Sequence, residues 1–378
     1  MALYAYAAAL TDNSLTILDV TDPTAPVFKS NIAGNGSPNY LGLITGLNKV
    51  GNYCYCGCAG TGIGLPGGDA CLTIIDVSNP AAPAFVSTLP VGSSTKSRKN
   101  IRRVFMVGNY CYMADSNSGL YIVDVSNPLL PSIVGSILFP ALGLTAAAML
   151  IGPYVYGSYA YLGYLDASLT PVGLIIVDIS NPAAPTFKGT LQDQTHFGQL
   201  GPFPSGNYCY AGGGQSLFGK NALNIIDISN PAAPTWLSWI TGADAPNFLK
   251  GCVGVFLESP YCYCSTEQGL TIIDISNPAV PTFVSNFSLG AITSFSIYKD
   301  GAYLYCASGI DATVYIVDVS TPATPSLSGS ISGAGSPNFL GYVSTVLTGS
   351  FPGPTPTPYQ SPPCIIDFKG ILDCIKLV

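Results

Sequence analysis

Seven aspartates recur at the same point of a repeated phrase in this chain of 378 residues: Asp19, Asp76, Asp124, Asp178, Asp227, Asp274 and Asp318. Carboxylates in proteins ligate metals or transfer protons. Each of these, however, stands four residues before a proline, and an aspartate at the start of such a turn accepts hydrogen bonds from the turn amides. Because a functional site is rarely repeated identically in every unit of a repeat protein, we predict that the seven carboxylates hold turns.

Other residue types that carry out catalysis are scarce. The single histidine, His196, lies in a segment that we interpret as a loop, and no serine or cysteine nucleophile motif accompanies it. Glutamate occurs only as Glu258 and Glu267, and the sequence contains no Cys-x-x-Cys pair of the kind that binds zinc. The sequence therefore predicts no catalytic residue, no metal site and no cofactor.

Twelve cysteines are many for a cytosolic protein. Several of them lie in predicted strands, where a buried thiol acts as a small apolar side chain. Cys58 and Cys71 flank the segment 59–70 and are expected to face each other across a hairpin, and Cys364 and Cys374 form a second pair. These two pairs are candidate disulfides, which would favour an exported protein.

Five of the 13 basic residues lie within eight positions: Lys96, Arg98, Lys99, Arg102 and Arg103. One interpretation is a solvated connection between repeats. The other is an interface patch that docks on an acidic surface of a neighbouring subunit or on an anionic polymer. The net charge of -7 and the scattering of the remaining basic residues argue against a nucleic-acid partner.

Charged residues make up only 9% of the chain and hydrophobic residues 48%. An average soluble protein has about 25% charged residues, so a large part of the surface is expected to be neutral or apolar. Gly, Pro, Asn and Asp interrupt every apolar stretch before it reaches the roughly 20 residues that a membrane span requires. We therefore expect no membrane span.

The aspartates belong to seven copies of one phrase, which reads LTIIDVSNPAAP from Leu72 and LTIIDISNPAVP from Leu270. Successive copies lie 44 to 57 residues apart, which is close to the length of one four-stranded blade of a β-propeller. The β-branched residues before each aspartate and the prolines after it favour a buried strand that ends in a turn. Upstream of each copy lies an alternating Tyr-x-Tyr motif that indicates a neighbouring strand, at residues 4–6, 53–55, 110–112, 159–161, 208–210, 261–263 and 303–305.

We therefore predict an all-β protein, a seven-bladed β-propeller with four-stranded antiparallel blades. The first copy of the Tyr-x-Tyr strand lies at the very start of the sequence, so the strand that precedes it in a blade has to be supplied from elsewhere. Residues 339–347 follow the seventh copy and can pair with residues 3–9. This pairing would close the ring and remove an open sheet edge.

The phrase LxIIDISNPxxP, preceded by Tyr-x-Tyr, resembles the LVIVD repeat, a propeller repeat of bacterial and archaeal proteins that are often exported. The similarity extends over about residues 1 to 350. It implies a propeller scaffold, and it implies no particular activity, ligand or catalytic residue.

We expect a propeller over residues 1–351, a semi-rigid Pro-rich linker over 352–363 and an apolar tail over 364–378. The tail has no place in a complete ring of seven blades, and its exposure to water would be unfavourable. It is expected to dock on a neighbouring subunit or on the propeller through Cys364, Ile365, Ile366, Phe368, Ile371, Leu372, Cys374, Ile375 and Leu377.

These features lead to three hypotheses about function. The first is a non-enzymatic structural protein, outside the cell or on its surface, that assembles with copies of itself into a filament or lattice; it rests on the low charge, the tail and the cysteines. The second is a monomeric cell-surface module that binds a protein or a glycan through the loops 59–70 and 212–222. The third is a propeller hydrolase or lyase with residues scattered among loops.

Overall fold

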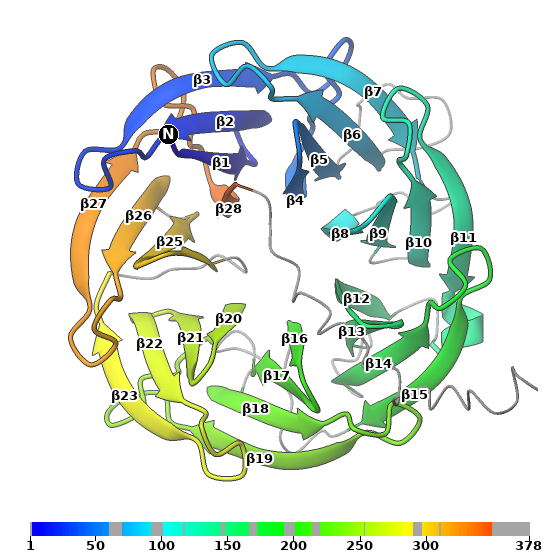
Figure 1. Cartoon of the computed structure of the whole chain (residues 1–378), viewed down its shortest axis with the longest axis vertical. Coiled ribbons are helices and arrows are strands. Elements are labelled where there is room, and N and C mark those ends of the chain that lie inside the picture. Colours follow the sequence, from blue (N-terminus) through cyan, green and yellow to red (C-terminus); the bar gives the residue numbers. More distant parts are fainter. Residues whose placement is uncertain are drawn as a thin grey trace, which may run out of the picture.

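The chain forms a closed ring of seven four-stranded antiparallel blades (Figure 1). The computed structural model describes residues 2–59, 70–91, 101–115, 118–144, 148–165, 172–192, 201–213, 220–252, 254–289, 297–309 and 311–349. The predicted seven-bladed propeller is thus confirmed. The predicted linker and the predicted tail lie outside the described residues. No helix in the described part of the chain is long and apolar enough to cross a membrane.

The blades follow one another around the ring, and in each blade the strands lie side by side from the channel to the outer rim. Blade 1 contains, from the inside outward, β28 (Val343–Thr348), β1 (Tyr4–Ala9), β2 (Ser14–Asp19) and β3 (Val27–Ala33). Blade 2 contains β4 (Ile44–Val50), β5 (Tyr53–Cys58), β6 (Cys71–Asp76) and β7 (Ala84–Pro90). Blade 3 contains β8 (Ile101–Val107), β9 (Tyr110–Asp115), β10 (Gly119–Asp124) and β11 (Ser132–Leu138), and the short 3-10 helix η1 (Phe139–Leu142) follows it.

The remaining four blades repeat this order. Blade 4 contains β12 (Met149–Tyr156), β13 (Tyr159–Leu165), β14 (Val172–Asp178) and β15 (Thr186–Gln192). Blade 5 contains β16 (Pro202–Ser205), β17 (Tyr208–Gly212), β18 (Ala222–Asp227) and β19 (Thr235–Thr241). Blade 6 contains β20 (Gly254–Glu258), β21 (Tyr261–Thr266), β22 (Gly269–Asp274) and β23 (Thr282–Phe287). Blade 7 contains β24 (Ile297–Asp300), β25 (Tyr303–Ser308), β26 (Thr313–Asp318) and β27 (Ser326–Ser332).

The ring closes in blade 1, where β28 from the end of the ring pairs antiparallel with β1. Tyr6 lies opposite Leu347 and Ala7 opposite Val346, as predicted from the sequence. A carboxylate also holds the joint, because Oδ2 of Asp12 accepts hydrogen bonds from the backbone N–H groups of Gly335 at 3.0 Å and Gly341 at 2.7 Å. Both ends of the ring are therefore tied into one sheet.

Neighbouring blades interlock through the Tyr-x-Tyr strands. The second tyrosine of every motif is at most 4% exposed, and in four blades it lies beside the cysteine in the middle of the next blade's motif. Tyr55 lies against Cys111, and Tyr161 lies against Cys209. A cysteine at this position leaves room for the incoming ring, and burial raises the pKa of both of these thiols.

A second contact between blades runs around the outer rim. A residue of each outermost strand meets the carbonyl oxygen of the first proline in the next blade's turn. In four blades this residue is a serine that donates a hydrogen bond of 2.5 to 2.6 Å to that oxygen: Ser30 to Pro80, Ser87 to Pro128, Ser238 to Pro278 and Ser285 to Pro322. In the other three it is a glycine on which a Cβ would lie only 2.0 to 2.4 Å from that oxygen: Gly135 at Pro182, Gly189 at Pro231 and Gly329 at Pro23.

Candidate functional site in the central channel

The innermost strands of the seven blades surround the channel of the ring. Each of them begins at a connection from the preceding blade, and in blades 2 to 7 each ends in a tight hairpin that leads to the Tyr-x-Tyr strand. We call the two ends of the channel the connection mouth and the hairpin mouth. Because side chains alternate along a strand, one set faces the following blade and the other set faces the preceding blade.

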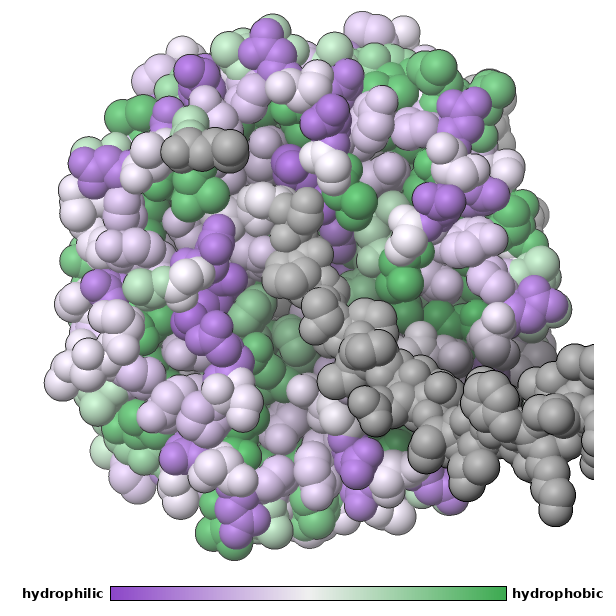
Figure 2. Space-filling view, viewed as in Figure 1, coloured by the Kyte–Doolittle hydropathy of each residue, from purple (hydrophilic) through white to green (hydrophobic). Residues whose placement is uncertain are grey.

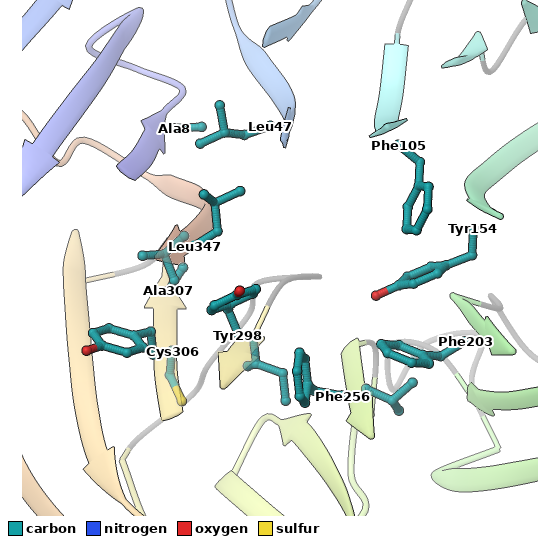
Figure 3. Packing of buried hydrophobic residues seen from close by; sticks show 14 of the residues in the cluster. Ala8, Leu47, Phe105, Tyr154, Phe203, Phe256, Tyr298, Cys306, Ala307 and Leu347 are labelled. Carbon is teal, nitrogen blue, oxygen red and sulfur yellow. The ribbon is translucent and has the colours of Figure 1, made fainter. Parts of the chain in front are cut away.

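Five aromatic side chains form a belt around the middle of the channel (Figure 3). They come from five successive blades, each lies opposite the second tyrosine of its own blade, and each is only 2 to 8% exposed. Their ring centroids lie 4.9, 4.4, 5.8 and 5.8 Å apart in the order Phe105, Tyr154, Phe203, Phe256 and Tyr298. Such tilted and edge-on pairs are favourable, so the belt joins the inner ends of these blades.

The belt is interrupted in blades 2 and 1, where the equivalent positions hold Asn48 and Leu347. Asn48 is only 3% exposed, and its Oδ1 has no hydrogen-bond partner among the described residues. A buried amide oxygen without a donor is unfavourable by about 1–3 kcal/mol. The channel wall therefore holds one unsatisfied acceptor at the level of the belt.

A cation lies on the belt toward the connection mouth. Arg103 is the third residue of β8, and its guanidinium carbon lies 4.6 Å from the centroid of the Tyr154 ring. Its side chain is half-buried. An arginine stacked on an aromatic face keeps its N–H groups free to bind an anion in its plane.

The hairpin mouth carries a different set of charges, at the inner ends of blades 6, 7 and 1. Glu258 ends β20, and its Oε2 lies 2.5 Å from Nζ of Lys299 on β24. The Glu258 side chain is 58% exposed, whereas that of Lys299 is only 7% exposed. Next to this pair, Oγ1 of Thr348 donates a hydrogen bond of 2.7 Å to Asp300. Figure 2 shows hydrophilic side chains gathered beside the centre of the ring, over the inner strands of blades 6 and 7.

Two tyrosines lie beneath this mouth. Burial and then the neighbouring Asp300 carboxylate raise the pKa of Tyr305 to about 12, and its buried hydroxyl has no partner among the described residues. Burial likewise raises the pKa of Tyr298, again with a contribution from Asp300. Both phenols therefore stay protonated at neutral pH.

The seven repeated aspartates lie far from the channel, in the turns between the third and fourth strands. In each of them Oδ1 accepts a hydrogen bond of 2.7 to 3.0 Å from the backbone N–H two residues later. Hydrogen bonds from that residue lower the pKa of six of these carboxyl groups, namely those of Asp19, Asp124, Asp178, Asp227, Asp274 and Asp318. They are turn residues and take no part in the channel.

The remaining candidate residues are only partly described. Lys96, Arg98, Lys99, His196 and most of the loops 59–70 and 212–222 lie outside the described residues, and so does the side chain of Arg102. Of the basic cluster, Arg103 is placed, and it lies in the channel wall. Cys58 and Cys71 face each other in the register of β5 and β6, but both are free thiols, and Cys364 and Cys374 lie outside the described residues. Among the described residues no group of three or more His, Cys, Asp or Glu side chains is arranged to hold a metal.

The fold and its repeats identify the family. The LVIVD repeat model matches residues 3–33, 67–89, 100–138, 154–193, 205–239, 254–288 and 295–332, which is more than half of the sequence. The chain therefore belongs to the LVIVD-repeat family. No curated protein matches the sequence.

Solved structures with the same architecture include enzymes. The periplasmic gluconolactonase of Pseudomonas aeruginosa matches with a TM-score of 0.65 and 11% identity, over 93% of this chain and 100% of the other. A Bacteroides fragilis protein for which a 6-phosphogluconolactonase activity is proposed matches with a TM-score of 0.67 and 12% identity, over 92% and 98%. Apo AztD from Citrobacter koseri matches with a TM-score of 0.53 and 12% identity, over 92% and 97%. At this identity the similarity is one of fold.

These similarities correct two predictions from the sequence. The expectation of a non-enzymatic protein that self-assembles into a filament or lattice is contradicted, because the propellers that match over 92–93% of the chain include lactonases. The expectation that the chain is not an enzyme is contradicted in the same way, because enzymes share this fold. Low charge and surplus cysteines misled the prediction, since in this structure the cysteines of the described residues are all buried within the ring.

Proposed function

We propose that the protein is a hydrolase that opens the ring of a sugar lactone at the hairpin mouth of the channel. The observation that carries the proposal is the ion pair of Glu258 and Lys299, in which an exposed carboxylate lies 2.5 Å from a buried ammonium group on the next blade. Lactone hydrolysis needs a base for the attacking water and a positive charge for the oxygen that becomes negative. This pair supplies both.

In the proposed reaction Glu258 accepts a proton from a water molecule whose oxygen attacks the lactone carbonyl carbon. The carbonyl oxygen takes the negative charge and is stabilised by the ammonium of Lys299. The C–O bond of the lactone ring then breaks, and the leaving alkoxide takes the proton from Glu258. The product is the open hydroxy acid, and both side chains return to their starting protonation.

The surroundings of Lys299 suit this role. Its Nζ donates a hydrogen bond of 2.5 Å to the carbonyl oxygen of Gly301 and contacts Glu258. Within the described residues these are its two partners, so one of its three N–H bonds is available to a substrate oxygen. Burial strengthens its electrostatic interaction with such an oxygen, because the effective dielectric constant is lower than in water.

The comparisons support a substrate class and a location. The Pseudomonas aeruginosa protein of the same fold is a periplasmic gluconolactonase, and we extend the lactone substrate from that protein to this one. We also propose that this chain acts outside the cytoplasm, in the periplasm or the extracellular space. Membership of a repeat family that is often exported is consistent with this location.

The test is hydrolysis of glucono-δ-lactone and related aldonolactones in a pH-stat, after subtraction of the spontaneous rate. The wild-type protein is expected to accelerate ring opening. Glu258→Gln is expected to lower kcat/KM by about 10²–10⁴, the usual contribution of a general base. Lys299→Met is expected to lower kcat by about 10²–10³, as removal of one oxyanion donor does.

The chain offers a matched control at its other glutamate. Glu267, in the turn between β21 and β22, forms a similar ion pair at 3.6 Å with Lys250, which lies in the connection between blades 5 and 6. Glu267→Gln and Lys250→Met are expected to leave the rate unchanged. Acceleration that survives Glu258→Gln would place the chemistry elsewhere, and no acceleration of any lactone would refute the proposed function.

A further inference from the structure

A cation toward the connection mouth of the channel, unpaired among the described residues, points to a ligand site that is distinct from the proposed hydrolytic pair. We propose that Arg103 anchors a binding site for a ring-shaped, hydroxylated carboxylate, a sugar acid in chemical terms, which enters from the connection mouth. The site lies at the other end of the channel from Glu258 and Lys299, and it does not depend on the proposed hydrolase activity.

Within the described part of the chain, the charge of Arg103 lacks the ion pair that several lysines have. Three lysines there form ion pairs, Lys188 with Asp178, Lys250 with Glu267 and Lys299 with Glu258. Arg103 has no carboxylate partner among the described residues, and the aromatic face of Tyr154 lies against its guanidinium. A half-buried guanidinium loses hydration that a ring face restores only in part. An anion would complete its hydrogen bonding.

The guanidinium of Arg103 is held in place by the Tyr154 ring. Its carbon lies 4.6 Å from the Tyr154 ring centroid, and a side chain fixed by such a contact loses little entropy when it binds. A planar guanidinium offers two parallel N–H bonds to a carboxylate. These two N–H bonds suit a carboxylate or phosphate group and do not suit a neutral hydroxyl.

Asn48 supplies an unsatisfied acceptor in the neighbouring blade. This residue and Gly46 lie on the same face of β4, two positions apart, and a Cβ on Gly46 would lie 2.8 Å from Cα of Arg103. The strands β4 and β8 are therefore in direct contact beside this site, and Oδ1 of Asn48 is buried nearby without a donor. A ligand hydroxyl would supply the missing hydrogen bond.

The aromatic belt supplies the apolar surface. Phe105 and Tyr154 form a tilted pair with centroids 4.9 Å apart (Figure 3), and the guanidinium carbon of Arg103 lies 4.6 Å from the Tyr154 ring centroid. Apolar ring edges next to one cation and one acceptor are the typical lining of a small-molecule site, in which a few polar groups orient the ligand. A sugar acid presents a carboxylate, hydroxyls and an apolar ring face, and so matches all three features.

The test is equilibrium binding of D-glucuronate to the full chain by isothermal titration calorimetry, with D-glucose and inorganic phosphate as the probes that lack the charge or the ring. Glucuronate is expected to bind at least tenfold more tightly than either. Arg103→Met keeps the apolar stem over Tyr154 and removes the charge, and it is expected to weaken glucuronate binding at least tenfold. The glucuronate affinity of Arg103→Lys is expected to lie between those of the wild type and Arg103→Met, because the charge stays and the paired N–H bonds are lost.

Lys188 provides the matched control, since its Nζ lies 5.6 Å from the Tyr159 ring but also 3.8 Å from the Asp178 carboxylate. Lys188→Met is expected to bind glucuronate like the wild type. Asn48→Leu is expected to weaken glucuronate binding without creating phosphate binding. Equal affinity for glucose, binding by Arg103→Met at wild-type strength, or no binding of glucuronate would each overturn the proposal. Because the readout is equilibrium binding, failure of lactone hydrolysis at Glu258 leaves this result unaffected.

Discussion

The contact between blades at the outer rim determines whether Gly135→Ala stabilises or destabilises the fold. A Cβ on Gly135 would lie 2.0 Å from the carbonyl oxygen of Pro182 in the next blade and 3.1 Å from Cδ of Pro185. An ordinary contact requires more than 3.4 Å, so Gly135→Ala must push two blades apart or bend the outer strand. Overpacking of this kind costs typically about 1–3 kcal/mol, and the rigid carbonyl places this case at the upper end.

An unhindered replacement of glycine by alanine would change the stability in the opposite direction. Gly135 has no left-handed backbone conformation, so without the steric contact Gly135→Ala would stabilise the fold by about 0.4–1 kcal/mol through the unfolded chain. At the equivalent position of blade 5, Ser238→Ala removes one hydrogen bond to Pro278 and is expected to cost about 1 kcal/mol. Urea unfolding followed by tryptophan fluorescence measures both changes. A stabilised Gly135→Ala variant would refute the close contact between blades 3 and 4.

Four further predictions concern the ring. Asp12→Ala leaves two backbone N–H groups without their acceptor and is expected to lower the free energy of unfolding by about 2–4 kcal/mol, in the same urea assay, with Asp12→Asn less affected. Phe256→Ala, which opens the belt, is expected to cost about 3–5 kcal/mol, and a change below about 1 kcal/mol would show that the belt is not packed. The pKa of Asp274 is lowered from 3.8 in the folded state. The ionised carboxylate therefore stabilises the fold above pH 3.8, and this stabilisation is lost as the pH falls through the folded pKa. In urea titrations between about pH 5 and pH 3, Asp274→Asn should lose less stability than the wild type. Cys58 and Cys71 lie in register, so purification under oxidising conditions is expected to join them, which peptide mass spectrometry detects as a loss of two hydrogens.

The number of blades and the closure of the ring were predictable because the signal repeats. Seven copies of a buried strand with a terminal aspartate fix the count, since each copy supplies the third strand of one blade. The pairing of β28 with β1 followed from a strand that the first blade lacked. Because the same pattern occurs seven times, a chance match at a single position does not change the predicted number of blades.

The channel was not predictable, because the innermost strands share no phrase. They range from MLIGPYVY in β12 to PFPS in β16, and neither resembles the others. Glu258 and Lys299 are 41 residues apart and lie on different blades, so only the stacking of blades brings them together. The sequence does carry one signal for the belt, an aromatic residue five positions before the Tyr-x-Tyr motif in blades 3 to 7, but the role of that residue is recognisable only once the strand register is known.

The low charge of the chain has a physical cause in the propeller itself and does not indicate self-assembly. In blade 2 the strands β5 and β6 are buried except for Tyr53 and Asp76, which are half-buried, and the middle strands of blades 3 and 6 are buried to the same extent. Strands covered on both faces by neighbouring blades have no place for charge. Their surface turns are built mainly from Ser, Asn, Pro and Ala around one or two aspartates, so each turn adds few ionisable groups. A chain of this architecture is therefore low in charge as a monomer, and its composition is no argument for a buried interface between copies.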